Sequence, residues 1–301
     1  MTKRNHEWLA ERFEENRSHL LAVAYRMLGS ASEADDAVQE SWLRLSRSGA
    51  EGIENLSAWL TTVVARVCMD ILRSRTSRRE QPLETPETIV SRSRTRNPEQ
   101  EAVLADSVSL ALMIVLDRLA PAERLAFVLH DLFAVPFEEI SSIIGRSQEA
   151  TRQLASRARR RVQGGEPDET LSQVDLQQQR ETVAAFLSAL RAGDFDRIVA
   201  VLDPNVVVHV DPGAGRPGTP AEIHGAVEWA KGAIAFAHTV SQAGHFVQPM
   251  LVDGNVGIVW APGGKLHRAL RFHFANGKIA EVDIIAVPAR LDKLDLAVLT
   301  S

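Results

Sequence analysis

The sequence contains a single cysteine, Cys68, among its 301 residues. One thiol excludes an internal disulfide framework and any zinc cage built from several thiolates. No apolar run approaches the ~18 residues that cross a bilayer, and the polar segment Met1–Glu7 contains no signal-peptide core. We therefore expect a protein of the reducing cytoplasm with no membrane anchor.

Lysine is also scarce in the first half of the chain, where arginine takes its place. Residues 1–163 contain Lys3 and 22 arginines against 23 acidic residues, whereas residues 164–301 contain 11 basic and 16 acidic residues. The net charge of −5 therefore belongs to the C-terminal part. The arginines cluster within residues 73–79, 92–96 and 152–161. Because a guanidinium group suits bidentate contact with phosphate and base edges, these clusters favour a nucleic-acid partner despite the acidic total.

Hydrophobic periodicity divides the chain into two kinds of structure. Helical spacing is expected for residues 8–28, 34–45, 58–75, 98–119, 121–132, 137–144 and 147–162. After Gly164, helices at 176–192 and 220–237 accompany strand-like runs at 206–210, 245–252, 256–260, 266–275 and 278–287. The turns Asp253-Gly254-Asn255 and Asn276-Gly277 are typical of β-hairpins. The sequence thus predicts an all-α N-terminal half followed by an α+β domain with a curved antiparallel sheet.

Two stretches rich in polar and helix-breaking residues set the expected domain boundaries. Linkers at residues 81–98 and 164–175 separate helical domains at 1–80 and 99–163 from a third domain at 176–301.

Residues 136–147 have the pattern of a helix followed by a tight turn, and Gly145 permits the turn. Ser147 caps the helix that follows. One face of this second helix carries side chains that bond base edges and phosphates: Glu149, Arg152, Gln153, Ser156, Arg157 and Arg160. The pattern favours a DNA-binding helix-turn-helix, and an ordinary helical hairpin with a solvated basic face is the alternative.

The helix at 58–75 provides a second basic surface. Arg66, Asp70 and Arg73 share the face opposite its apolar stripe. A solvated helix face would look the same, but two basic surfaces separated by a linker suit two DNA elements spaced along one duplex.

With these surfaces in place, residues 8–162 resemble a bacterial sigma factor of the extracytoplasmic-function (ECF) type. Residues 33–44 (EADDAVQESWLR) match sigma region 2.2, residues 58–73 match regions 2.3 and 2.4, and residues 116–161, which begin LDRLAPAER, match region 4. The resemblance implies a region 2 helical bundle and a region 4 helix-turn-helix. It also implies a protein that binds core RNA polymerase and directs it to the −10 and −35 promoter elements.

The resemblance further implies a role for each matching position. Docking on the polymerase β′ coiled coil falls to Asp36, Gln39 and Glu40, and the β subunit is a second polymerase contact. The 52–55 loop receives a flipped non-template base, which helps to open the duplex. Contact with the −10 element falls to Asn55, Arg66, Asp70 and Arg73. Recognition of the −35 element falls to Glu149, Arg152, Gln153, Ser156, Arg157 and Arg160.

Residues 178–290 resemble the SnoaL-like, NTF2-like cone. ECF sigma factors with this extension form recognised groups, the SigJ-like group among them, in which the extension is thought to regulate the sigma factor. The stretch Asp211-Pro212-Gly213-Ala214-Gly215 departs from the Asp-Gly-Gly-Gly-Lys of the best-known group and indicates a sister group. Competition of the acidic C-terminal domain with DNA for the arginine surfaces is one hypothesis for the regulation.

The same cone hosts enzymes, so a cyclase or isomerase fused to a DNA-binding module is the alternative function. His209, Asp211 and His273 are the candidates to line a cavity as an acid–base set and to contact a small-molecule ligand. No histidine pair has ligand spacing on one element, so we predict no metal site and no cofactor. The GxGxxG string at 213–218 lies outside a βαβ unit and is expected to be a loop. A helix-turn-helix repressor is disfavoured, because it needs no polymerase-docking helix, and we expect a non-enzymatic sigma factor.

Overall fold

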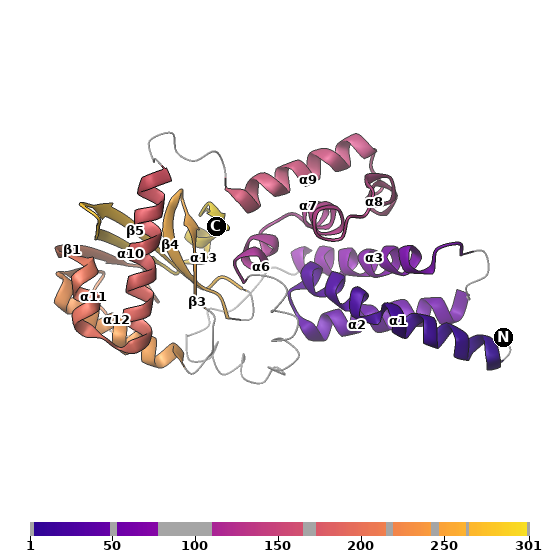
Figure 1. The fold of residues 1–301 in the computed structure, drawn as a ribbon, viewed down its shortest axis with the longest axis horizontal. Coiled ribbons are helices and arrows are strands. Elements are labelled where there is room, and N and C mark those ends of the chain that lie inside the picture. The colour runs from indigo at the N-terminus through magenta and orange to yellow at the C-terminus, as the bar shows by residue number, and fades with distance from the viewer. Residues whose placement is uncertain are drawn as a thin grey trace. The chain divides into compact units, whose positions relative to one another are not determined.

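A computed structural model describes residues 3–48, 53–77, 110–164, 173–214, 219–241, 247–262 and 265–299. The contacts divide the chain into two compact units (Figure 1). Of the described residues, unit 1 contains 3–77 and 116–160, and unit 2 contains 110–115 and 161–299. The expected linker at 81–98 and most of the one at 164–175 lie outside the described residues.

Unit 1 begins with three packed helices, α1 (Lys3–Leu28), α2 (Ala31–Ser48) and α3 (Leu56–Ser77). Apolar residues at helical spacing form its core, including Leu20 and Met27 of α1, Val38 of α2 and Val64 of α3. Cys68 of α3 is buried among them, and burial raises the pKa of its thiol to about 12. The cysteine is therefore a packing residue.

The second part of unit 1 carries the expected helix-turn-helix. It comprises the end of α6 (Leu110–Asp117), α7 (Pro121–Phe127), the π-helical turn η1 (Val128–Leu132), α8 (Phe137–Ile144) and α9 (Gln148–Gln163), whose last residues belong to unit 2. Gly145 has a φ of 73° and donates its N–H to Ser141 O, so it ends α8 in the left-handed conformation that favours glycine. The helix predicted at 121–132 is α-helical only as far as Phe127, and its remaining residues form the π-helical turn η1.

The two helical groups of unit 1 share a buried arginine. Arg124 of α7 is 1% exposed; its Nε donates to Arg26 O at 3.1 Å, and its Nη1 lies 3.5 Å from Asp117 Oδ1. Burial lowers the pKa of Arg124 to about 10, which still leaves it charged at neutral pH. The ring of His19 in α1 packs edge-on against Phe133, with 5.3 Å between centroids. Helices from the segments expected as domains at 1–80 and 99–163 are therefore in direct contact within unit 1.

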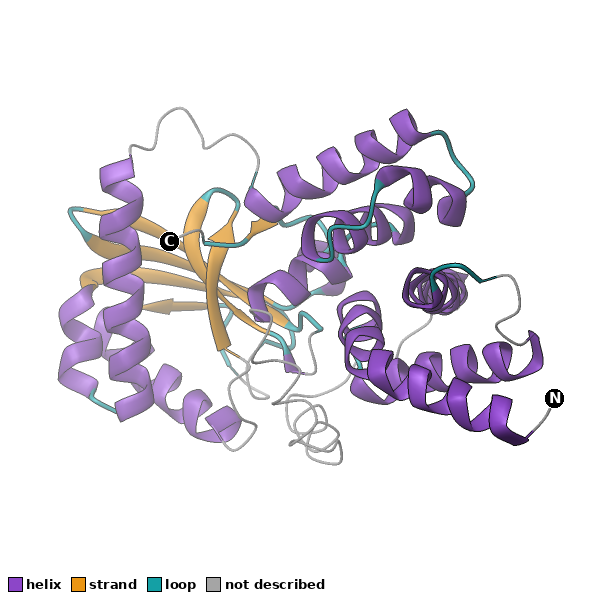
Figure 2. Ribbon diagram, turned by 45° about the vertical axis from the view of Figure 1, so that its right-hand side comes forward, coloured by secondary structure: helices purple, strands orange, loops and turns teal. Residues whose placement is uncertain are grey.

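Unit 2 is built on a seven-stranded sheet with the strand order β2-β1-β6-β5-β4-β3-β7. The strands are β1 (Leu202–Val210), β2 (Glu222–His224), β3 (Val247–Val252), β4 (Asn255–Trp260), β5 (Arg268–Ala275), β6 (Lys278–Ile285) and β7 (Leu296–Ala297). The helices are α10 (Gln173–Ala192), α11 (Phe195–Val201), α12 (Ala226–Ser241) and the short α13 (Pro288–Leu291) (Figure 2). The helical N-terminal half and α+β C-terminal part are confirmed.

The sheet is mixed, which corrects the expectation of an antiparallel sheet. Strands β3 to β6 form an antiparallel meander, and both predicted hairpin turns have positive φ at their two central residues. Strand β1 instead pairs with β6 in parallel. The turn signals could not predict this parallel pairing, because β1 and β6 are far apart in the sequence and no tight turn joins them. Strand β2 lies within the segment predicted as the start of the 220–237 helix, which begins at Ala226.

The two faces of the sheet have different coverings. One face packs against α10, α11 and α12 in an apolar core that contains Phe186, Ile198, Val208, Trp229 and Phe272. On the other face, apolar residues of β3 to β6 cluster with Ala111, Ile114 and Val115 of α6. Val298 N–H also donates to Val162 O at 2.9 Å. Unit 2 thus includes the first residues of α6 and the last residues of α9.

Candidate nucleic-acid and polymerase interfaces

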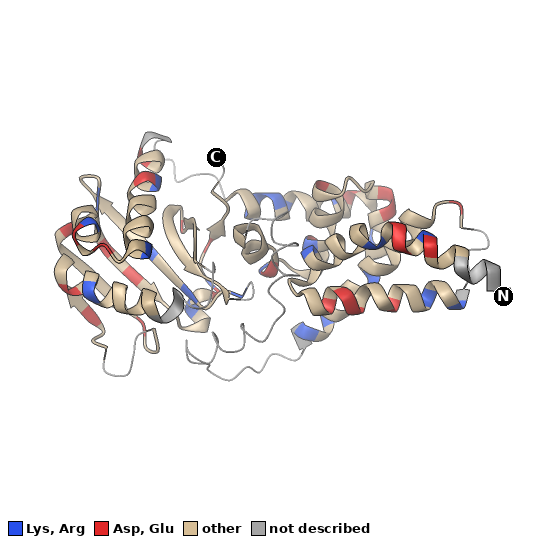
Figure 3. Ribbon diagram, turned by 60° about the horizontal axis from the view of Figure 1, so that its bottom comes forward, with Lys and Arg blue, Asp and Glu red and all other residues tan. Residues whose placement is uncertain are grey.

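Helix α2 presents the expected acidic face. Ala34, Ala37 and Val38 are buried on one side, whereas Asp36 and Gln39 are exposed and Glu40 is half-buried on the other. Glu40 Oε1 accepts from Arg44 Nε at 3.0 Å. The three predicted docking residues therefore share one solvent-facing surface, on a helix whose opposite side is fixed in the core. Figure 3 marks the acidic residues of the chain in red and the basic residues in blue.

In the loop before α3, the Asn55 side chain caps the start of that helix. Asn55 Oδ1 accepts the N–H of Ala58 at 3.1 Å, which is the hydrogen bond of a helix N-cap. Gly52, the first residue of the loop expected to receive a base, lies outside the described residues. The hydrogen bond therefore fixes Asn55, and with it the described part of the loop, at the N-terminal end of α3.

Helix α3 brings Arg66, Asp70 and Arg73 together on its exposed side. Arg73 Nη1 lies 4.0 Å from Asp70 Oδ1, a weak exposed pair. A cleft of about 410 Å³ lies between α2 and α3, lined by Glu33, Arg44, Val67, Asp70, Ile71, Ser74 and Arg75. Arg75 is not part of the exposed set, because it pairs with Glu33 and donates to Leu28 O at 3.0 Å.

Helix α9 exposes the residues expected at the −35 element. Glu149, Arg152, Gln153, Ser156, Arg157 and Arg160 are all exposed. Thr151, Leu154, Ala155 and Ala158 on the other side are buried. Ser147 Oγ accepts the N–H of Ala150 at 3.2 Å and caps the helix, as predicted.

Two of the α9 arginines brace the helix-turn-helix. Arg157 Nε donates to Glu123 Oε1 of α7 at 2.9 Å, and Arg159 pairs with Asp131 of η1. The guanidinium of Arg152 lies 5.7 Å from the centre of the Phe137 ring, which stacks on His130 with 3.8 Å between centroids. Arg157 therefore has a partner within the protein, whereas the Phe137 ring supports Arg152 at the exposed surface.

The three residues expected to line a cavity do not form one set. Asp211 is buried, accepts the backbone N–H groups of Ala286 and Val287 at 3.1 and 3.2 Å, and pairs with Arg290. These bonds anchor the chain where β6 leads into α13. His209 follows Val208 on β1 and therefore points to the sheet face opposite the helix-covered core.

His209 and His273 instead join a polar cluster across four strands. His209 Nε2 lies 3.1 Å from Glu281 Oε1, and His273 Nε2 lies 3.5 Å from Asp283 Oδ2. Burial opposes ionisation of Asp283, but hydrogen bonds from Arg271 more than offset it and lower the pKa of this carboxyl. The sequence reasoning missed Glu281 and Asp283, since only strand pairing brings them beside His209.

Of the helices that the structure describes, none combines the length and apolar character that crossing a bilayer requires.

Comparison with known families matches three segments of the chain. Residues 12–78 match sigma-70 region 2, residues 109–162 match sigma-70 region 4, and residues 183–282 match the SnoaL-like domain. The probable ECF RNA polymerase sigma factor SigI of Mycobacterium tuberculosis is 32% identical over 301 residues, which cover 96% of this chain and 97% of SigI. The chain belongs to the ECF sigma factors. The ECF RNA polymerase sigma factor SigJ of the same species is 41% identical over 221 residues, covering 71% of this chain and 68% of SigJ.

Two solved structures resemble this ECF sigma factor. The crystal structure of M. tuberculosis SigJ covers 94% of this chain and 98% of its own, with 30% identity and a TM-score of 0.46. The sigma factor RpoE in complex with the anti-sigma factor NepR from Bartonella quintana covers 50% of this chain and 91% of its own, with 17% identity and a TM-score of 0.35. As an ECF sigma factor, the protein directs core RNA polymerase to promoters, and its region 4 binds DNA.

Proposed function

We propose that the exposed face of α9 recognises the −35 element, that the α3 surface contacts the −10 element, and that α2 docks on the β′ coiled coil. The observation that carries the proposal is the segregation on α9, where all six predicted contact residues are exposed and the opposite side is buried. The N-terminal part of such a helix enters the major groove, where Arg and Gln bond base edges.

Replacement of Gln153 tests this assignment. Gln153→Ala is expected to lower run-off transcription by core polymerase roughly tenfold from a promoter with an intact −35 element. Transcription from the same promoter with a scrambled −35 element should not change. Gln177→Ala, the same substitution at an exposed position of α10, is the control. An equal loss on both promoters would contradict base recognition by Gln153.

The packing within unit 1 supports a closed resting form. Region 2 and region 4 share the buried Arg124, so their helices are in direct contact. The −10 and −35 elements lie about 25 base pairs apart, roughly 85 Å along B-form DNA at 3.4 Å per base pair. Helices in contact cannot cover both elements, so promoter binding requires region 4 to separate from region 2.

The SnoaL-like domain sets the activity of the sigma factor by supporting α6. Seven of the eight described residues of this helix, LALMIVLD, are apolar, and a helix this apolar is stable only when packing buries it. Ala111, Ile114 and Val115 are buried in the apolar cluster on the outer face of the sheet, which is the face opposite α10, α11 and α12. On this proposal, region 4 depends on the C-terminal domain for its first helix, and the domain has a supporting role in recognition of the −35 element.

A substitution in the part of the sheet that contacts α6 tests whether the C-terminal domain supports this helix. Ala269 of β5 is fully buried in that cluster, and a phenylalanine there overfills it and displaces α6. Ala269→Phe is expected to reduce −35-dependent transcription by roughly tenfold, as is truncation after Gln163. Ala275→Phe, at an exposed position of the same strand, should have wild-type activity. Unchanged or higher transcription from both the Ala269 variant and the truncated chain would contradict the supporting role.

A further inference from the structure

The outer face of the sheet carries a cluster of polar side chains beside its apolar half. Backbone register places His209 of β1 opposite Asp283 of β6 and opposite Glu222 of β2. On the far side of β6, Arg271 pairs with Asp283 and His273 with Glu281 in register. Four neighbouring strands thus present acidic residues and histidines to one surface.

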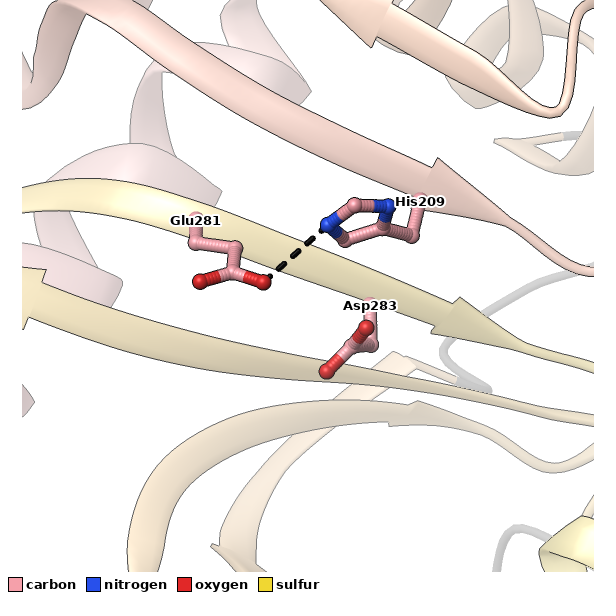
Figure 4. Close-up of side chains that lie close together, drawn as sticks. All are labelled: His209, Glu281 and Asp283. Atoms are coloured by element: carbon pink, nitrogen blue, oxygen red, sulfur yellow. Dashed lines mark hydrogen bonds and ion pairs between the residues drawn. The ribbon is translucent and has the colours of Figure 1, made fainter.

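Three of these residues bring possible metal-ligand atoms together (Figure 4). One ring nitrogen of His209 and one carboxylate oxygen each of Glu281 and Asp283 all lie within 4.8 Å of one another. Tetrahedral coordination with ~2.0–2.2 Å bonds places ligand atoms about 3.4 Å apart. His209 and Glu281 are half-buried, so modest rotation of their side chains closes the remaining distance.

Both ring nitrogens of His209 lie beside carboxylate oxygens. Its Nδ1 lies 3.2 Å from Glu222 Oε1, and its Nε2 lies 3.1 Å from Glu281 Oε1. A neutral imidazole carries one N–H, so when Nδ1 donates to Glu222 the lone pair of Nε2 faces a carboxylate oxygen. Two acceptors at that distance repel each other unless a proton or a metal ion lies between them.

The side chains around the cluster carry a formal negative charge, which attracts a cation. Four carboxylates, those of Glu222, Asp253, Glu281 and Asp283, face one guanidinium, that of Arg271, which leaves a formal charge of −3 when the histidines are neutral. Arg271 bonds Asp253 and Asp283, whereas Glu222 and Glu281 pair with histidines. A divalent cation offsets two of the three negative charges.

We propose that His209, Glu281 and Asp283 bind a divalent transition-metal ion, and the ligand set suits Zn²⁺. His209 binds it through Nε2, and each carboxylate supplies one oxygen. Glu222 accepts from Nδ1 and orients the ring, as outer carboxylates do at many metal-ligating histidines. An imidazole with two carboxylates is typical of zinc, whereas Mg²⁺ prefers oxygen ligands alone. Bound zinc joins β1 to β6, the parallel pair of the sheet.

Zinc titration of the chelator-treated, full-length protein tests the site. Calorimetry with ZnCl₂ should give one equivalent per chain. His209→Gln and Glu281→Gln should each weaken binding by at least about 100-fold, and Glu222→Gln by about tenfold. His238→Gln, the same substitution at an exposed position of α12, should bind as the wild type does. MgCl₂ in place of ZnCl₂ should not bind.

Two further measurements separate the site from its alternatives. The urea midpoints of the variants without zinc report whether they fold, and a folded Glu281→Gln variant with wild-type affinity overturns the proposal. Binding that survives in His209→Gln reveals adventitious zinc at other histidines and also overturns it. Nitrogen NMR of the imidazole that shows protons on both His209 nitrogens, undisplaced by zinc, identifies the cation as a proton and has the same consequence.

Discussion

At the scale of single residues, buried polar groups hold distant segments of each unit together. Arg124 joins α7 to the end of α1, and Asp211 joins the end of β1 to the segment after β6. Gln179 of α10 does the same in unit 2, donating to Asn255 Oδ1 and accepting the N–H of Val256. Each bonds backbone or a second polar side chain, although Arg124 Nη2 is buried without a hydrogen-bond partner among the described residues.

His267 makes the stability of unit 2 sensitive to acid. Burial, with a smaller contribution from Lys265, lowers the pKa of His267 from 6.5 to about 4. Between about pH 6.5 and pH 4, His267 is therefore protonated in the unfolded chain but neutral in the folded protein. The folded state consequently loses stability as the pH falls through this range. His267→Gln is expected to reduce the drop in urea midpoint between pH 7 and pH 5. His238→Gln, at an exposed site, should leave the drop unchanged, and an equal drop in His267→Gln would contradict the assignment.

Residue types and spacing predicted which side of each helix is exposed, but not which charged residues have internal partners. The exposed side of α9 is as predicted, whereas Arg157 also bonds Glu123, 34 residues earlier. Asp211 was a candidate for an acid–base set and instead bonds backbone 75 and 76 residues later. Such partners come from tertiary packing, which helical and strand periodicity does not encode.

At the scale of elements, the turn between α8 and α9 depends on the conformation of one residue. Gly145 has a φ of 73°, and an added Cβ there would meet no atom within 4 Å. The cost of a substitution is therefore conformational, about 1 kcal/mol for Gly145→Ala, measured as the free energy of urea unfolding. Gly145→Asn should cost less, because asparagine tolerates the left-handed region. An equal cost for both variants would point to a steric cause instead.

Helices and turns that local sequence patterns specify were predictable, whereas strands that form only by pairing with a distant strand were not. The helix predicted at 137–144 has the bounds of α8, and both hairpin turns lie where their Gly and Asn residues indicate. Strand β2 has three residues, Glu222-Ile223-His224, whose extended form depends on pairing with β1. The polar cluster around His209 escaped prediction for the same reason, since strand order and register create it.

At the scale of the whole molecule, the opening proposed above depends on the packing of region 4 on region 2. Arg124→Ala removes the bonds to Arg26 and Asp117 and leaves a cavity, so the open form should gain population. Fluorophores on cysteines introduced at the exposed positions Glu54 and Ser142 are expected to show lower energy transfer in the variant. Cys68 does not compete for the label, because its thiol is buried.

The exposed Arg12, whose Nη1 pairs with Glu15, supplies the control for this measurement. Arg12→Ala should keep the energy transfer of the parent, since an exposed pair contributes little. Circular dichroism checks that the Arg124 variant keeps its helices. Unchanged energy transfer in a folded Arg124→Ala protein would mean that other contacts hold the closed form.

The division of α6 between the two units has a consequence for synthesis on the ribosome. The strands that cover Ala111, Ile114 and Val115 extend to Ile285, about 170 residues later, and translation at ~5–20 residues per second delivers them roughly ten to thirty seconds later. Under the supporting role proposed above, region 4 gains its packed α6 only after the sheet has been made. A translation product that stops before the sheet then lacks this support, so the order of the domains along the chain delays full promoter recognition.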